Sequence, residues 1–164
     1  MLNVINQFMP TVKTILYCED DAVVRHVYKK RLEQAGHHVL YAEDGLEALK
    51  CLSKLVPDLV VLDLMMPKFS GEEVLKYICN EPRLHEVPLV ILSTNREVEE
   101  GYNQIAGRAD KYLVKHNCTP DKLLGVIHEI FNGPAPESLS NLGGDSDTLT
   151  FEKIKLLVGG PPTS

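Results

Sequence analysis

At residues 59–67 the chain reads Leu59-Val60-Val61-Leu62-Asp63-Leu64-Met65-Met66-Pro67. The first four residues are all apolar, which is typical of a central parallel strand covered by helices on both faces. A carboxylate follows directly, and burying a charge beside a wholly apolar strand is costly without polar partners. We therefore predict a central strand whose end carries a functional acid, Asp63.

On both sides of this stretch, short runs rich in β-branched residues alternate with amphipathic segments. Such alternation is typical of repeated βα units around a parallel sheet. The sequence therefore predicts an α/β fold with a doubly wound sheet and five helices. The five predicted strands are Thr14–Cys18, His38–Ala42, Leu59–Leu64, Leu89–Leu92 and Tyr112–Val114.

The predicted helices start at residues whose side chains accept hydrogen bonds from unpaired backbone N–H groups. Gly36 is expected to end the first helix, because glycine adopts the left-handed conformation at little cost. The expected caps are Asp21, Asp44, Ser70 with Glu73, Thr94 with Glu97, and Thr119 before Pro120.

The length of 164 residues and the 44% hydrophobic fraction suit one globular domain with a tail. After Phe131 the sequence turns to Gly, Pro, Ser and Asp, which is typical of a linker. We expect a domain at residues 13–133, an extension at 1–12, and a linker with a tail at 134–164. Within that tail, Leu149 to Val158 could form one short docked element.

Charge and cysteine usage narrow the function classes. The formal net charge is −6 and no segment carries a basic stripe, so direct nucleic-acid binding is disfavoured. No stretch reaches the ~20 apolar residues of a membrane helix, and the start lacks signal-peptide features. The four cysteines are scattered without metal-ligand spacing, which favours reduced thiols in a cytoplasmic protein.

Acidic residues follow two of the predicted strands. Glu19 and Asp20 end the first, and Asp63 ends the third. In a doubly wound sheet these strands flank the switch point where ligands bind, so the carboxylates should converge. Clustered like charges call for a cation, and an all-oxygen set favours Mg²⁺ or Mn²⁺.

Two further residues end the neighbouring strands: Ser93 closes the fourth and Lys115 the fifth. A hydroxyl and a point positive charge, together with a metal ion, could surround the oxygens of a phosphoryl group on Asp63. Phosphoryl transfer requires mainly positioning and charge neutralisation, so this small set is sufficient.

Four segments in order resemble the receiver domains of response regulators. The resemblance runs from about Lys13 to Phe131 and implies a flavodoxin-like (βα)5 three-layer sandwich with a parallel sheet of order 2-1-3-4-5. The segments are Ile15-Leu16-Tyr17-Cys18-Glu19-Asp20-Asp21, Leu59 to Pro67 as quoted above, Val87-Pro88-Leu89-Val90-Ile91-Leu92-Ser93 and Ala109-Asp110-Lys111-Tyr112-Leu113-Val114-Lys115.

The resemblance assigns the metal site and the phosphoacceptor. It implies that Asp63 accepts the phosphoryl group and is also a metal ligand, and that Asp20 binds the metal directly. Glu19 would be a ligand directly or through water, and the backbone carbonyl of Met65 would complete the protein's share of the shell.

The resemblance also assigns a switch. Ser93 would be the hydroxyl that moves to the phosphoryl oxygen, Lys115 the pairing cation, and Tyr112 the aromatic that turns inward. The expected partners are a histidine kinase or phosphotransfer protein and a downstream protein target. Signalling would use the face formed by the fourth helix, the fifth strand and the fifth helix. A homodimer could form through the same face. Such a domain is not an enzyme in the usual sense, because it catalyses only its own phosphorylation and dephosphorylation.

Three residues depart from the family pattern. His116 stands where proline is usual, so the cis peptide expected after Lys115 loses its main physical cause. Arg108 replaces a usual glycine and would be strained if that position needs positive φ. Thr94 follows the switch serine where a smaller residue is common, which would narrow access to Asp63.

Other interpretations remain open from the sequence. Glu19 and Asp20 could merely favour a helix N-terminus, Ser93 could be a turn residue, and Lys115 could lie on the surface. A receiver-like interaction module that acts without phosphorylation is the alternative function. A metal-dependent phosphatase is disfavoured, because no second acid stands two residues after Asp63.

Overall fold

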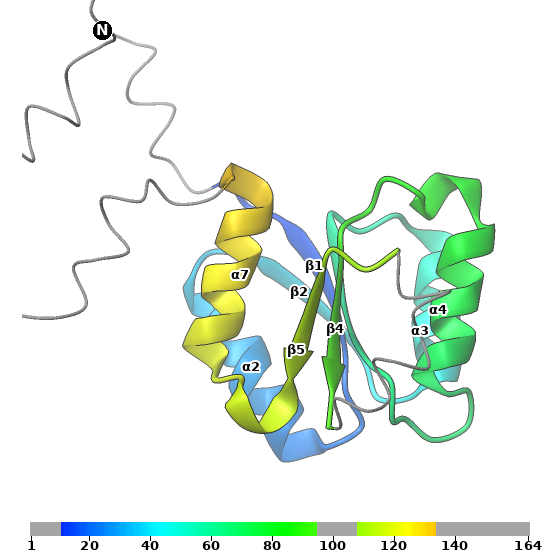
Figure 1. Ribbon diagram of the computed structural model, residues 1–164, viewed down its shortest axis with the longest axis horizontal. Helices are drawn as coiled ribbons and strands as arrows, with labels where there is room; N and C mark the ends of the chain where they lie inside the picture. Colours follow the sequence, from blue (N-terminus) through cyan, green and yellow to red (C-terminus); the bar gives the residue numbers. More distant parts are fainter. Residues whose placement is uncertain (1–10, 95–107, 134–164) are drawn as a thin grey trace, which may run out of the picture. The chain divides into compact units, whose positions relative to one another are not determined.

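The computed structural model describes residues 11–94 and 108–133 (Figure 1). Strands and helices alternate along these residues, as predicted. In chain order the elements are β1 (Thr14–Cys18), α2 (Ala22–Gln34), β2 (His38–Ala42), α3 (Gly45–Lys54), β3 (Leu59–Asp63), α4 (Gly71–Asn80), the 3₁₀ turn η1 (Pro82–Leu84), β4 (Leu89–Ser93), β5 (Lys111–Val114), the 3₁₀ turn η2 (Lys115–Asn117) and α7 (Pro120–Asn132).

The five strands form one parallel sheet of order β2-β1-β3-β4-β5, which confirms the predicted fold class. The strand β3 lies between β1 and β4, with Val61 in register with Tyr17 on one side and Val90 on the other. The predicted strand boundaries differ by one residue at most: β3 ends at Asp63, β4 includes Ser93, and β5 begins at Lys111.

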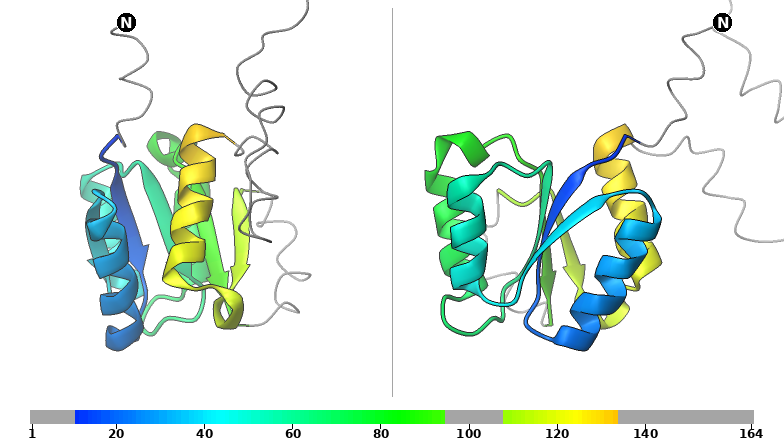
Figure 2. Two further views of the ribbon diagram at one scale, coloured as in Figure 1. Left: turned by 90° about the vertical axis from the view of Figure 1, so that its left-hand side faces the viewer. Right: turned by 180° about the vertical axis from the view of Figure 1, so that it is seen from behind.

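Helices cover both faces of the sheet. The helices α3 and α4 lie on one face, whereas α2 and the first turns of α7 lie on the other (Figure 2). Contacts divide the chain into two units after Val126, so the fold described here is that of the first unit. Of the second unit, the structure describes the last turns of α7 and Gly133.

The apolar core explains why β3 is central. All five residues of β3 and all five of β4 are buried. On one face, Leu16, Leu62 and Ile91 join a cluster with Leu75 and Ile78 from α4. Complete burial of such a side chain contributes about 2 kcal/mol relative to exposure. Burial on both faces fixes the strands and therefore the positions of the residues at their ends.

The predicted helix caps are present wherever the structure describes them. Asp21 accepts hydrogen bonds from two backbone N–H groups of the first turn of α2, and Asp44 caps α3. Ser70 and Glu73 form the predicted capping box of α4. The Thr119 hydroxyl accepts from Lys122 N at 3.2 Å, and Gly36 after α2 has φ of +92°.

Several predictions fall outside the described residues. These are the helix expected after Thr94 and Glu97, most of the extension at 1–12, the linker and tail at 134–164, and the short element at Leu149 to Val158. All four cysteines are described and all are free, as predicted. Among the described helices, none has the length and apolar content needed to cross a membrane.

Candidate functional site

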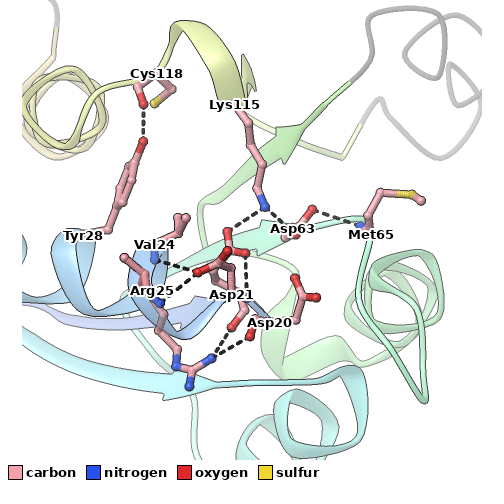
Figure 3. Close-up of polar contacts among 11 residues, drawn as sticks. Asp20, Asp21, Val24, Arg25, Tyr28, Asp63, Met65, Lys115 and Cys118 are labelled. Carbon is pink, nitrogen blue, oxygen red and sulfur yellow. Dashed lines mark hydrogen bonds and ion pairs between the residues drawn. The ribbon is translucent and has the colours of Figure 1, made fainter.

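Most of the predicted site residues meet at the carboxyl ends of the strands, where they line a pocket of about 650 Å³; Figure 3 shows Asp20, Asp63, Met65 and Lys115 among them. The parallel arrangement brings the ends of β1, β3, β4 and β5 to one edge of the sheet. The pocket wall includes Glu19, Asp20, Asp63, Thr94 and Lys115. The structure therefore brings together groups that are far apart in the sequence, with Glu19 and Lys115 separated by 96 positions.

Three carboxylates form the centre of the site. One oxygen each of Glu19, Asp20 and Asp63 lies within 4.8 Å of the other two. Glu19 and Asp63 are almost completely buried, at 0% and 1% exposure, whereas Asp20 is exposed. Burial raises the pKa of Glu19 above its usual value and the nearby Asp63 adds to the rise, while Lys115 opposes it.

Lys115 pairs with two of these acids. Its Nζ lies 2.6 Å from Oδ2 of Asp63 and 2.7 Å from Oε2 of Glu19. Burial alone would lower the pKa of the Lys115 amine, but its hydrogen bonds to Asp63 and Glu19 outweigh burial, so the pKa is raised. The amine is therefore charged and balances one of the three carboxylates.

The loop after β3 holds Asp63 from the other side. The other carboxylate oxygen, Oδ1, accepts a hydrogen bond from Met65 N at 3.0 Å. The backbone of this loop returns so closely that a Cβ on Gly71 would lie 2.2 Å from the carbonyl oxygen of Asp63. Only glycine fits at this approach, because the atoms in the way belong to the backbone. Both oxygens of the Asp63 carboxylate thus have fixed partners.

The loop after β1 is held by contacts that the sequence did not reveal. Asp21 N donates to Oε1 of Glu19 at 3.1 Å. From α2, the Arg25 guanidinium donates to the backbone carbonyls of Glu19 at 2.8 Å and Asp20 at 3.2 Å. Nothing in the sequence distinguished Arg25 from the other basic residues of α2, because its partners are backbone atoms.

A tyrosine pair was also missed. Tyr17 of β1 lines the pocket and stacks on Tyr28 of α2, with ring centroids 5.7 Å apart. The Tyr28 hydroxyl donates to the carbonyl of Cys118, just after the segment that carries Lys115. The Tyr17 hydroxyl is buried and has no hydrogen-bond partner among the described residues. The sequence did not single out Tyr17, because tyrosine is common in buried strands, and nothing in the sequence linked it to Tyr28 of α2.

The predicted switch residues lie at different depths. Ser93 ends β4, is 3% exposed, and stands one position beyond Leu92, the register partner of Asp63. Thr94 is exposed and belongs to the pocket wall. Tyr112 lies in β5, half-buried against the apolar core, and is not among the residues that line the pocket.

The departures from the family pattern leave the site intact. No cis peptide bond occurs in the described residues, and Lys115, which His116 follows, still reaches Asp63. The strain considered for Arg108 is absent, because Lys68 is the one non-glycine residue with positive φ among those described. Instead, the Arg108 guanidinium donates to the backbone carbonyls of Leu84 and Val87, both at 2.7 Å.

The donor set fits a divalent cation. Three carboxylates and one ammonium leave two negative charges without a counter-charge in the cluster. The candidate ligands are oxygen atoms, which Mg²⁺ and Mn²⁺ prefer, and the exposed Asp20 leaves a side open to solvent. The arrangement can therefore bind a metal ion beside a carboxylate that is already aligned by a lysine.

Comparisons with known proteins agree with this geometry. The family model of the response regulator receiver domain matches residues 15–128. Response regulator MprA of Mycobacterium sp. (strain KMS) is 32% identical over 142 residues, covering 87% of this chain and 59% of MprA. The phosphate regulon transcriptional regulatory protein PhoB of Escherichia coli is 30% identical over 130 residues, covering 79% and 56% respectively. The chain thus spans less than three fifths of the length of these two relatives.

Solved structures give the same result. The chemotaxis response regulator CheY4 of Vibrio cholerae superposes with a TM-score of 0.66 at 27% identity, covering 73% of this chain and 99% of CheY4. Response regulator protein TrrA of Thermotoga maritima, solved in complex with Mg²⁺-BeF, superposes with a TM-score of 0.64 at 29% identity, covering 73% and 99%.

The fold and the site define a signalling receiver of two-component systems. This chain belongs to the response regulator receiver domain family.

Proposed function

We propose that this chain is a phosphorylatable receiver in which Asp63 accepts a phosphoryl group in the presence of Mg²⁺. The observation that carries the proposal is the Lys115 ammonium, 2.6 Å from a buried Asp63 carboxylate that also accepts a hydrogen bond from Met65 N. A lysine and a metal-binding set of acids around one aligned carboxylate is the arrangement that phosphoryl transfer needs.

In the proposed reaction, a carboxylate oxygen of Asp63 forms the new P–O bond while the P–N bond of a phosphohistidine donor breaks and the imidazole leaves. Lys115 neutralises charge on Asp63 and on the incoming phosphoryl oxygens. Glu19 and Asp20, with the Met65 carbonyl, would hold Mg²⁺, which when bound neutralises the same oxygens. Hydrolysis returns the carboxylate when water attacks phosphorus and the acyl-phosphate P–O bond breaks.

The readout is proposed to run through Ser93 and Tyr112. The buried Ser93 hydroxyl would move to a phosphoryl oxygen, and Tyr112, already half-buried in β5, would turn inward into the space that this motion opens. Thr94 on the pocket wall would restrict access of donors and water. Partners are a histidine kinase or phosphotransfer protein and a downstream protein, with self-association through β5 and its neighbouring helices as a further outcome.

The proposed direct target of this domain is a protein rather than DNA. PhoB is a transcriptional regulatory protein by name, and this chain spans 56% of it. The chain's net charge of −6 and the acidic cluster of the site disfavour electrostatic attraction to DNA. A protein target is therefore the proposal that the charge of this chain favours.

Beryllofluoride with Mg²⁺ is the direct test, because it mimics an aspartyl phosphate without turnover. In ¹H–¹⁵N spectra we expect shifts at the amides of Asp63, Met65 and Ser93, and no such shifts in Asp63→Asn. Acetyl phosphate should add one phosphoryl mass to the unmodified protein and none to that variant. An unmodified protein that gives neither response would refute the proposal and leave the phosphorylation-independent module as the better interpretation.

A further inference from the structure

We infer that Arg25 is a positioning residue for the metal site: its guanidinium sets the orientation of Glu19 and Asp20 by holding their backbone carbonyls. The inference rests on the proposed function, since it concerns the affinity of the same acids for Mg²⁺. It adds a residue of α2 that makes no contact with the carboxylates themselves and that the sequence pattern did not single out.

The contacts show a cation that bridges two consecutive peptide groups. Nη1 of Arg25 donates to the carbonyl oxygens of Glu19 at 2.8 Å and of Asp20 at 3.2 Å. Figure 3 shows the guanidinium on the opposite side of the loop from Lys115. Lys115 thus contacts the carboxylates, whereas Arg25 contacts the backbone of the residues that carry two of them.

This backbone contact restricts where the carboxylates point. Fixing the carbonyl oxygen of a residue fixes the peptide plane that follows, and so restricts the ψ angle of that residue. Glu19 has two further constraints, because its N–H donates to the carbonyl of Ala42 at 3.0 Å and its Oε1 accepts from Asp21 N. Asp20 is exposed, and its backbone contact with Arg25 orients it toward the other two acids.

The guanidinium is itself held in place. Its carbon lies 5.3 Å from the centroid of the Tyr41 ring, and Nη2 lies 3.6 Å from Oε2 of Glu43. The side chain is only 14% exposed. Planar stacking on an aromatic ring and several donors in one plane are properties of arginine that lysine lacks. Arg25 is therefore pre-organised before a metal ion arrives.

Charge and geometry predict opposite effects when Arg25 is changed. A positive charge close to the acids repels Mg²⁺, so removing the charge alone would raise the affinity for the ion. Loss of positioning would lower it, because residues that orient metal ligands typically contribute about 10-fold or more to metal affinity. Arg25→Met tests both effects at once, and Arg25→Lys keeps the charge while losing the guanidinium that reaches both carbonyls.

Mg²⁺ titration of the full chain, followed by the amide signals of Asp63 and Met65, tests the inference. Arg25→Lys should bind Mg²⁺ about 10-fold more weakly, and Arg25→Met should also bind more weakly but by a smaller factor, because the lost charge acts in the opposite direction. Lys29→Met is the control: it removes a charge from the same helix that pairs with Glu33, and it should bind as the unmodified protein does. The same spectra report whether each variant is folded, and Arg25→Lys keeps the aliphatic stem and charge.

The outcomes separate this inference from the proposed function. Unchanged affinity in Arg25→Lys, or equal or tighter binding in Arg25→Met, would overturn the role of Arg25 and leave the receiver proposal standing. An unmodified protein that binds no Mg²⁺ would overturn both. Weaker binding in Lys29→Met to the same extent would also overturn the inference, because the effect would then be a general one of helix charge.

Discussion

Replacing Lys115 by methionine should destabilise the domain strongly in the absence of divalent metal and much less in its presence. The lysine pairs with Asp63 at 2.6 Å and with Glu19 at 2.7 Å. These two carboxylates are 1% and 0% exposed, so removing the ammonium leaves two buried acids without their positive partner. Methionine keeps the length and the apolar contacts of the side chain and removes the charge.

The magnitude follows from this burial. At an effective dielectric constant of about 20, each contact corresponds to a Coulomb energy of roughly 6 kcal/mol, most of which desolvation offsets. Removing one partner of a buried ion pair typically costs about 3–5 kcal/mol, because the remaining charge stays buried and unpaired. We expect a loss of that size in the free energy of unfolding of Lys115→Met in EDTA. In Mg²⁺ at about 100 times the dissociation constant of the variant, metal binding should restore about 2.7 kcal/mol of the variant's free energy of unfolding.

Urea unfolding followed by circular dichroism, in EDTA and in excess Mg²⁺, measures both quantities. Lys29→Met is the matched control, since its exposed partner Glu33 on α2 makes a change of no more than about 0.5 kcal/mol expected. A loss below about 1 kcal/mol for Lys115→Met in EDTA would contradict the role given to the buried pairs. Equal stabilisation of variant and unmodified protein by Mg²⁺ would contradict the expectation that the metal ion replaces the positive charge that the variant has lost.

Three further changes test other parts of the structure. Gly71→Ala should lower the free energy of unfolding in urea by about 3 kcal/mol, because the new Cβ would meet backbone atoms at 2.2 Å and 2.5 Å. Gly125→Ala is the control: its Cβ would meet no described atom within 4 Å, so the substitution should be neutral or stabilise α7. Tyr17→Phe should keep or slightly raise the free energy of unfolding, because it removes a buried hydroxyl that has no hydrogen-bond partner among the described residues. A decrease of about 1 kcal/mol or more would show instead that the hydroxyl is hydrogen-bonded. The hydrogen bond from Lys68 lowers the pKa of Asp44, so the stability gained from this carboxylate is present above its unfolded pKa and is lost as the pH falls through the folded value. Asp44→Asn keeps the cap and removes the charge, so its stability deficit should shrink from pH 6 toward about pH 2, and a deficit independent of pH would refute this.

The sequence by itself determined the elements and their ends. Apolar runs such as residues 59–62 predicted buried strands, and caps such as Asp21 and Ser70 predicted helix starts, because these signals depend on hydrogen bonds and periodicity within a few residues. The same strand patterns placed Asp63 and Lys115 at strand ends, and the resemblance to receiver domains assigned their roles. Boundaries were correct to within one residue for every described strand.

Only the tertiary structure decided how these ends meet. Lys115 reaches two acids that precede it by 52 or more positions. Arg25 of α2 holds the backbone of the β1–α2 loop. Arg108 has an unstrained backbone and donates to the carbonyls of Leu84 and Val87, which lie 24 and 21 positions before it. Their partners are often backbone atoms, which every residue type offers equally. A residue pattern therefore fixes which groups stand at the edge of the sheet, and packing of the helices on that sheet fixes the distances between them.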